Sequence, residues 1–95
     1  MDRKGIRQAL ENGDFDGISY VYKPYDGYGK TSFQRSMRVV GPVIEWTLTA
    51  FGKVFNGKEN ERYADSKTEL LEGDSALDFI ESHSYSFQKK RPDLF

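Results

Sequence analysis

The spacing of apolar residues along the chain changes several times, and each change predicts a boundary between elements. Residues 2–11 carry apolar side chains at helical spacing, which predicts a short helix. Asp2 is a favourable cap for the start of this helix, and Asn12-Gly13 is a favourable stop. The first element is therefore expected to be a helix of about three turns.

From residue 18 the apolar period falls to two, as on a strand with one buried face. Residues 18–23 are β-branched and aromatic and predict a first strand, which Pro24 must end or confine to a sheet edge. Residues 25–30 contain Asp-Gly and a second glycine, which predict a turn. A second strand is predicted over residues 31–40, and Gly41-Pro42 breaks it.

Residues 43–51 fit two patterns. Their apolar positions continue a helical stripe that reaches residue 55, but Ile44 and Trp46 also alternate strictly with polar neighbours. Because β-branched and aromatic residues suit a pleated surface better than a helix, a strand is predicted here. Asn56-Gly57 then predicts the turn of a further hairpin.

The last third of the chain is predicted to be mainly helical. Residues 59–71 predict an acidic helix with frayed ends, and residues 76–83 predict a clearer helix that Asp74-Ser75 caps. Residues 84–88 alternate again and predict a short final strand. Residues 89–95 are expected to form a flexible basic tail.

Strands grouped before helices, rather than alternating with them, predict an α+β fold. We expect a small antiparallel sheet of three to four strands, a short N-terminal helix, and one or more acidic C-terminal helices packed on one face. At 95 residues the chain has the length of one domain. The prediction is a single domain over residues 1–88 followed by the tail.

Composition restricts the compartment and the class of partner. The chain has no cysteine, which favours a reducing, cytoplasmic environment for so small a domain. Its longest apolar stretch, residues 39–44, is far shorter than the roughly 20 residues that cross a bilayer, so no membrane partner is expected. A net charge of −1 supplies no overall attraction for nucleic acid.

Charge is distributed unevenly despite this balance. Residues 59–81 contain eight acidic side chains against two basic ones. Basic residues gather in the first half of the chain and again near its end, at Lys89-Lys90-Arg91. The acidic stretch is either an interaction face or a solvated surface, and its sequence does not distinguish the two.

Motifs that would indicate catalysis or a cofactor are incomplete. Gly29-Lys30-Thr31 matches the end of a phosphate-binding loop, but Pro24 occupies the position of that loop's first glycine. Residues 12–23 imitate a calcium loop up to its last position, where Lys23 replaces the required Glu. The single histidine, His83, is expected to lie at a helix C-terminus. We therefore predict no enzymatic activity, no cofactor and no metal site.

The final residues, Asp93-Leu94-Phe95, resemble the ends of short peptides that dock into bacterial sliding clamps. Those peptides favour glutamine at the position where this chain has Arg91. The alternative is that this apolar terminus folds back onto the sheet.

Aromatic and basic side chains gather in the predicted first hairpin. A sheet that presents rings beside cations can stack bases or anchor a protein partner. Tyr20, Tyr22 and Phe33 can instead be explained as core residues, whereas exposed rings in a glycine-containing turn favour recognition. The candidate binding residues are Lys23, Tyr25, Tyr28, Lys30, Arg35 and Arg38.

The sequence therefore favours a small binding protein, an adaptor or inhibitor that acts through protein–protein contacts. The alternative is single-stranded nucleic-acid binding by the Tyr/Lys/Arg hairpin. A spare edge strand and many aromatic residues also allow a homodimer.

Overall fold

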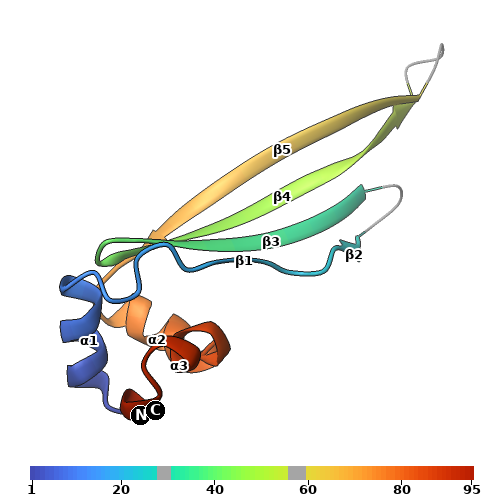
Figure 1. The fold of residues 1–95 in the computed structure, drawn as a ribbon. Helices are drawn as coiled ribbons and strands as arrows, with labels where there is room; N and C mark the ends of the chain where they lie inside the picture. Colours follow the sequence, from blue (N-terminus) through green and yellow to red (C-terminus); the bar gives the residue numbers. More distant parts are fainter. Residues whose placement is uncertain (28–30, 56–59) are drawn as a thin grey trace.

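The chain forms a long antiparallel sheet with its helices gathered at one end (Figure 1). The computed structural model describes residues 1–27, 31–55 and 60–95, and it describes side chains in these ranges outside residues 53–64. The predicted α+β class is confirmed. The sheet has five strands rather than three or four, because two stretches predicted as turn and helix also pair in it.

The N-terminal helix agrees with its prediction. Helix α1 spans Arg3–Glu11, and the Asp2 carboxylate accepts a hydrogen bond from the Gly5 N–H at 3.0 Å. The helix ends at Asn12, and Gly13 follows with a φ of 80°, a backbone conformation that glycine adopts readily.

The sheet has the order β1-β3-β4-β5, and β2 pairs with the far end of β3. Strand β1 spans Ser19–Val21, β2 Tyr25–Asp26, β3 Thr31–Val40, β4 Val43–Phe55 and β5 Asn60–Leu71. The strand predicted over 43–51 is confirmed and is longer than predicted. Part of the predicted turn is β2, and residues 28–30 lie outside the described residues.

The helix predicted over residues 59–71 is wrong, because these residues form β5. The strand pairs along its length with β4, from Ile44 opposite Leu71 to Phe55 opposite Asn60. Pairing with a strong neighbouring strand overrides the weak helical preference of an acidic segment. The predicted Asn56-Gly57 turn lies outside the described residues.

Two short helices follow the sheet, and both differ in detail from prediction. Helix α2 spans Asp74–Ser82, and its N-cap is Gly73, which has no side chain to cap it. The predicted cap Asp74 lies in the first turn instead and accepts a hydrogen bond from Arg7 at 2.8 Å. Helix α3, Tyr85–Lys90, replaces the strand predicted over 84–88. Alternation there would put Tyr85 and Phe87 on one face, yet Phe87 is buried and Tyr85 is exposed.

The expected flexible tail is instead packed against the domain. Lys89 and Lys90 end α3, and Pro92–Leu94 form a short 3-10 helix, η1. Leu94 is buried, and its carbonyl accepts a hydrogen bond from the Asp2 N–H at 2.8 Å. The apolar terminus therefore folds back onto the protein. The Leu94 side chain, which a clamp-binding peptide would offer to its partner, is buried in this structure.

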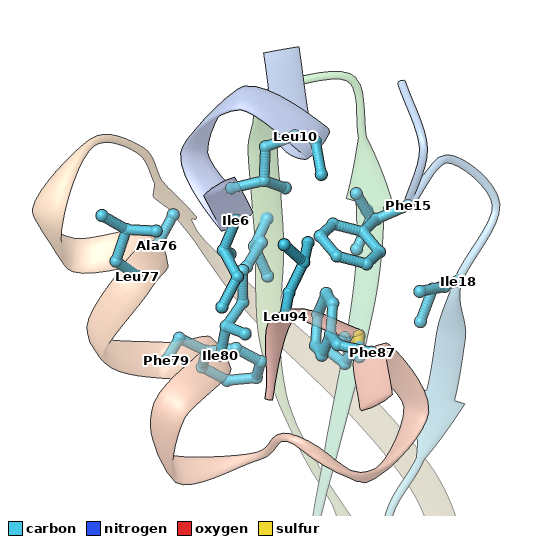
Figure 2. Close-up of a cluster of buried hydrophobic side chains, with 14 residues drawn as sticks. Ile6, Leu10, Phe15, Ile18, Ala76, Leu77, Phe79, Ile80, Phe87 and Leu94 are labelled. Carbon is cyan, nitrogen blue, oxygen red and sulfur yellow. The ribbon is translucent and has the colours of Figure 1, made fainter. Parts of the chain in front are cut away.

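The hydrophobic core lies between the helices and the near end of the sheet (Figure 2). Its largest fully buried side chains are Phe15, Phe87, Ile6, Ile44 and Ile80. The strands continue well beyond this core, so the molecule measures 56 × 19 × 18 Å. Its radius of gyration is 16.7 Å, against about 12 Å for a compact chain of this length.

Candidate binding surface on the sheet

Strand register divides the side chains of the sheet between two faces. The helices cover the near end of the face that carries Met37, Val39 and Ile44, which we call the helix-side face. Ser36 and its partner Thr47 point to the opposite face. Helices lie over only the near end of the helix-side face, and the far end has none in the described part of the chain (Figure 1).

On β2, β3 and β4, the far end of the helix-side face carries mainly apolar and aromatic side chains, whereas the neighbouring β5 residues Lys67 and Asp65 are charged and exposed. Phe33 pairs with Ala50, and Arg35 pairs with Leu48, one step closer to the helices. Tyr25 of β2 lies opposite Phe33, and the two rings stack with centroids 5.7 Å apart. We call Tyr25, Phe33, Arg35, Leu48 and Ala50 the distal face. Tyr25 is 51% exposed there, and the other four are half-buried between their neighbours.

An aromatic cluster connects the distal face to the core. The Trp46 ring contacts Tyr22, Phe79 and His83, with ring centroids 4.9 to 5.6 Å away. The Arg35 guanidinium lies 5.1 Å from the centroid of the Trp46 ring, which is a cation–π contact. The apolar stripe of the core therefore continues along β4 on the helix-side face, from Ile44 through Trp46 to Leu48 and Ala50.

The opposite face has a different chemistry. Thr47 and Thr68 bond through their hydroxyls at 2.9 Å, and Thr49 and Ser66 do the same at 2.9 Å. Hydroxyl pairs of this kind satisfy each other and are compatible with water. Val21, Val40 and Leu70 are exposed apolar side chains of this same face, so the two faces differ mainly along the middle of β4, where Leu48 and Ala50 lie on one side and Thr47 and Thr49 on the other.

The predicted binding residues do not all lie on one surface. Tyr25 and Arg35 lie on the distal face, and Lys23 is exposed in the segment between β1 and β2. Arg38 lies on the opposite face, where its guanidinium bonds Glu45 at 2.9 to 3.2 Å. Tyr28 and Lys30 lie outside the described residues.

The separation of Arg35 from Arg38 follows from strand periodicity. Residues three apart on a strand point to opposite faces, so their parity alone indicates that they cannot share a patch. Leu48 and Ala50 were not predicted as surface residues. The sequence does contain a signal for them. The alternation of apolar and polar residues in β4 continues for more residues than the core of a 95-residue chain can cover.

The acidic groups of α2 form ion pairs with α1. Arg3 bonds Asp78 at 3.0 Å and Glu81 at 2.8 Å. The hydrogen bond to Asp78 is the main cause of the raised pKa of the Arg3 guanidinium. These carboxylates therefore hold two helices together at the surface, and each exposed pair contributes modestly to stability.

The described side chains contain no group of His, Asp and Glu residues arranged to hold a metal ion. His83 caps the C-terminal end of α2, stacks on Phe79 with centroids 4.2 Å apart, and places Nδ1 3.2 Å from the Phe79 carbonyl. Burial, followed by the nearby Tyr20, raises the pKa of the Tyr22 phenol, so that hydroxyl is neutral at physiological pH. None of the described helices has the length and apolarity needed to cross a membrane.

Comparisons with protein-family models, with curated proteins and with solved structures found no match for this chain.

Proposed function

We propose that the protein is a non-enzymatic binding module that takes a protein partner on its distal face. The observation that carries this proposal is the apolar stripe of the helix-side face, which continues past the helices with no described element to cover it. An apolar surface that continues a core in this way is typical of an interaction site.

Energetics favour a partner here. Narrow β-ribbons are only marginally stable in water unless an apolar face packs against something. Covering Phe33, Leu48 and Ala50 removes apolar surface from water, at roughly 25 cal/mol for each Å². Because the strands are already ordered by their pairing, a partner would not have to order them, which lowers the cost of binding.

Charge indicates the partner's chemistry. Arg35 of β3 and Lys67 of β5 lie on either side of Leu48 on the helix-side face, and the described carboxylates of β5 on that face are Asp65 and Glu69. Cations that flank an apolar strip favour a partner whose apolar residues are bordered by carboxylates. We therefore propose an apolar, acid-flanked protein segment as the occupant.

The test compares two lysine substitutions at neighbouring positions of β4. Leu48→Lys puts a charge into the distal face, and the matched control Thr49→Lys puts the same charge on the opposite face. Partners captured from the source cell would be identified by mass spectrometry, purified and titrated with each variant. We expect Leu48→Lys to weaken binding at least tenfold and Thr49→Lys to change it less than twofold, with circular dichroism confirming that both fold.

Equal effects of the two substitutions would contradict the proposal. Light scattering after size exclusion provides a second arm. A dimer that Leu48→Lys dissociates and Thr49→Lys leaves intact would show that the occupant is a second copy of this chain, and would overturn the acid-flanked partner.

Single-stranded nucleic-acid binding is the second candidate function. It is favoured by the positions of Tyr20, Tyr22 and Tyr25 on one face with Arg35. Bases stacked on such rings contribute about 1–3 kcal/mol each, and binding to the backbone weakens as salt is added. A labelled oligonucleotide that shows no anisotropy change with micromolar protein at low salt would exclude this function.

A further inference from the structure

A separate hollow lies between the β1 edge of the sheet and the turn that joins α2 to α3. Its volume is about 400 Å³, within the usual range for small-molecule sites. It shares no residue with the distal face. The lining residues are Tyr20, Tyr22, Ser82, His83, Ser84, Tyr85 and Ser86.

Rings supply most of the apolar surface of this groove. Tyr22 and His83 are half-buried, with ring centroids 5.7 Å apart, and both contact Trp46 on the core side. Tyr20 and Tyr85 are 47% and 69% exposed. The groove therefore has a fixed aromatic base, with two rings available for stacking on a planar ligand.

Its polar groups are suited to an anion. The hydroxyls of Ser82, Ser84 and Ser86 have no hydrogen-bond partner among the described residues, so they are free to donate to a ligand. No carboxylate lines the groove, and the Lys89 amine lies 4.5 Å from the centroid of the Tyr85 ring. Donors beside a cation, with no acid to repel the ligand, favour phosphate oxygens.

We propose that this groove binds a nucleotide. Its base contacts the exposed rings of Tyr20 and Tyr85, and its phosphate accepts hydrogen bonds from the serine hydroxyls, with Lys89 as the nearby positive charge. A free nucleotide and the terminal nucleotide of a single strand offer the same chemistry. This site goes beyond the protein-binding function and does not depend on it.

Trp46 provides the readout, because it is the only tryptophan and its ring lies 5.6 Å from Tyr22 and 5.5 Å from His83. Its fluorescence would be titrated with AMP, adenosine, ribose 5-phosphate and a short oligoadenylate. We expect saturable binding of AMP at or below about 1 mM. Adenosine is expected to bind at least fivefold more weakly, and ribose 5-phosphate without measurable saturation.

Substitutions at the rim test the residues themselves. Tyr85→Ala and Lys89→Ala are expected to weaken AMP binding about tenfold and about fivefold, in line with the usual strength of a stacked base and of an exposed phosphate contact. Both residues are exposed, so neither substitution threatens the core. Tyr25→Ala, which removes another exposed tyrosine ring from the distal face, is the control and should leave AMP binding within twofold.

The outcomes distinguish a free nucleotide from the end of a single strand, and the groove from the distal face. AMP binding equal to that of oligoadenylate identifies a free nucleotide as sufficient, and much tighter oligoadenylate binding that still needs Tyr85 identifies a strand end. No saturable AMP response up to about 10 mM overturns the proposal. So does AMP binding that Tyr85→Ala and Lys89→Ala leave unchanged. Leu48→Lys should not alter this binding, so failure here leaves the distal-face proposal intact.

Discussion

The near and far ends of this sheet share β3, β4 and β5 with the same alternation, but among the described elements helices lie over the near end alone. Ile44 and Leu48 lie four residues apart on one face of β4. Ile44 is fully buried beneath the helices, whereas Leu48 is only half-buried by its neighbours in the sheet. The comparison shows that a strand's pattern chooses which side chains face a core, whereas other elements decide whether a core is there.

The largest expected effect is on the free energy of unfolding, when phenylalanine is replaced by alanine once in the core and once on the distal face. Phe87 is fully buried, with its ring against Phe15 at a centroid distance of 5.2 Å, and Phe33 lies on the distal face. Phe87→Ala is expected to lower the free energy of unfolding by about 3–5 kcal/mol, because it leaves a cavity. Phe33→Ala should lower it by about 1 kcal/mol or less, since it removes only a partly buried surface contact.

Urea denaturation followed by circular dichroism measures both values. If Phe87→Ala prevents folding, Phe87→Leu provides a milder measurement, expected to fall between wild type and Phe87→Ala. Equal losses at the two positions would show that the distal face is already part of the cooperative core of the isolated protein.

Hydrogen exchange provides the next sharpest comparison. Backbone amides of residues 47–52 at the far end of β4 should exchange at least tenfold faster than those of residues 43–46 at the near end. Residues 44–52 pair with both β3 and β5, and Val43 pairs with β3, so the difference reports local opening of the uncovered ribbon rather than missing bonds. Uniform protection along β4 would contradict it. A bound partner on the distal face should remove the difference.

A smaller effect on stability is expected on the opposite face of the sheet, where the hydroxyl pairs lie. Thr47 and Thr68 form a cross-strand pair, and a double-mutant cycle with Thr47→Val and Thr68→Val should give a coupling energy of about 0.2–1 kcal/mol. Such a value would indicate that this face stabilises the ribbon from within. A coupling of zero would mean that water replaces the hydroxyl pair at no cost.

The smallest expected effect is a change in stability at low pH that involves Asp93, near the end of the chain. The hydrogen bond from Arg91 lowers the pKa of the Asp93 carboxyl below its ordinary value of 3.8. A carboxyl with a lowered folded pKa stabilises the protein above its unfolded pKa and loses that contribution as the pH falls through the folded value. The stability difference between wild type and Asp93→Asn should therefore be present near pH 7 and shrink below about pH 3.8. A difference that does not change with pH would show that the ion pair contributes nothing.

Part of the fold could be predicted because it depends on local signals. The cap at Asp2, the stop at Asn12-Gly13 and the strand over residues 31–40 agree with the sequence analysis. Residues 59–71 and 84–88 were predicted wrongly for opposite reasons. The first stretch is a strand because β4 pairs with it, and the second is a helix because only Phe87 has a place in the core.

The candidate sites could be predicted only in part. Tyr25 and Arg35 were named from composition, but their separation from Arg38 depends on strand parity and register. The groove proposed for a nucleotide joins β1 to Ser82–Ser86, which are some sixty residues away along the chain. No local pattern indicates that such segments meet.

The sequence by itself determined where the chain bends, which residues alternate and which end of α1 is capped, because these depend on backbone preferences over a few neighbours. Tertiary structure decided which part of the helix-side face lies beneath helices and which part does not. It also decided that Leu94 is buried rather than carried on a tail. The physical reason is that burial depends on what packs across a surface, and those contacts come from residues distant in the chain.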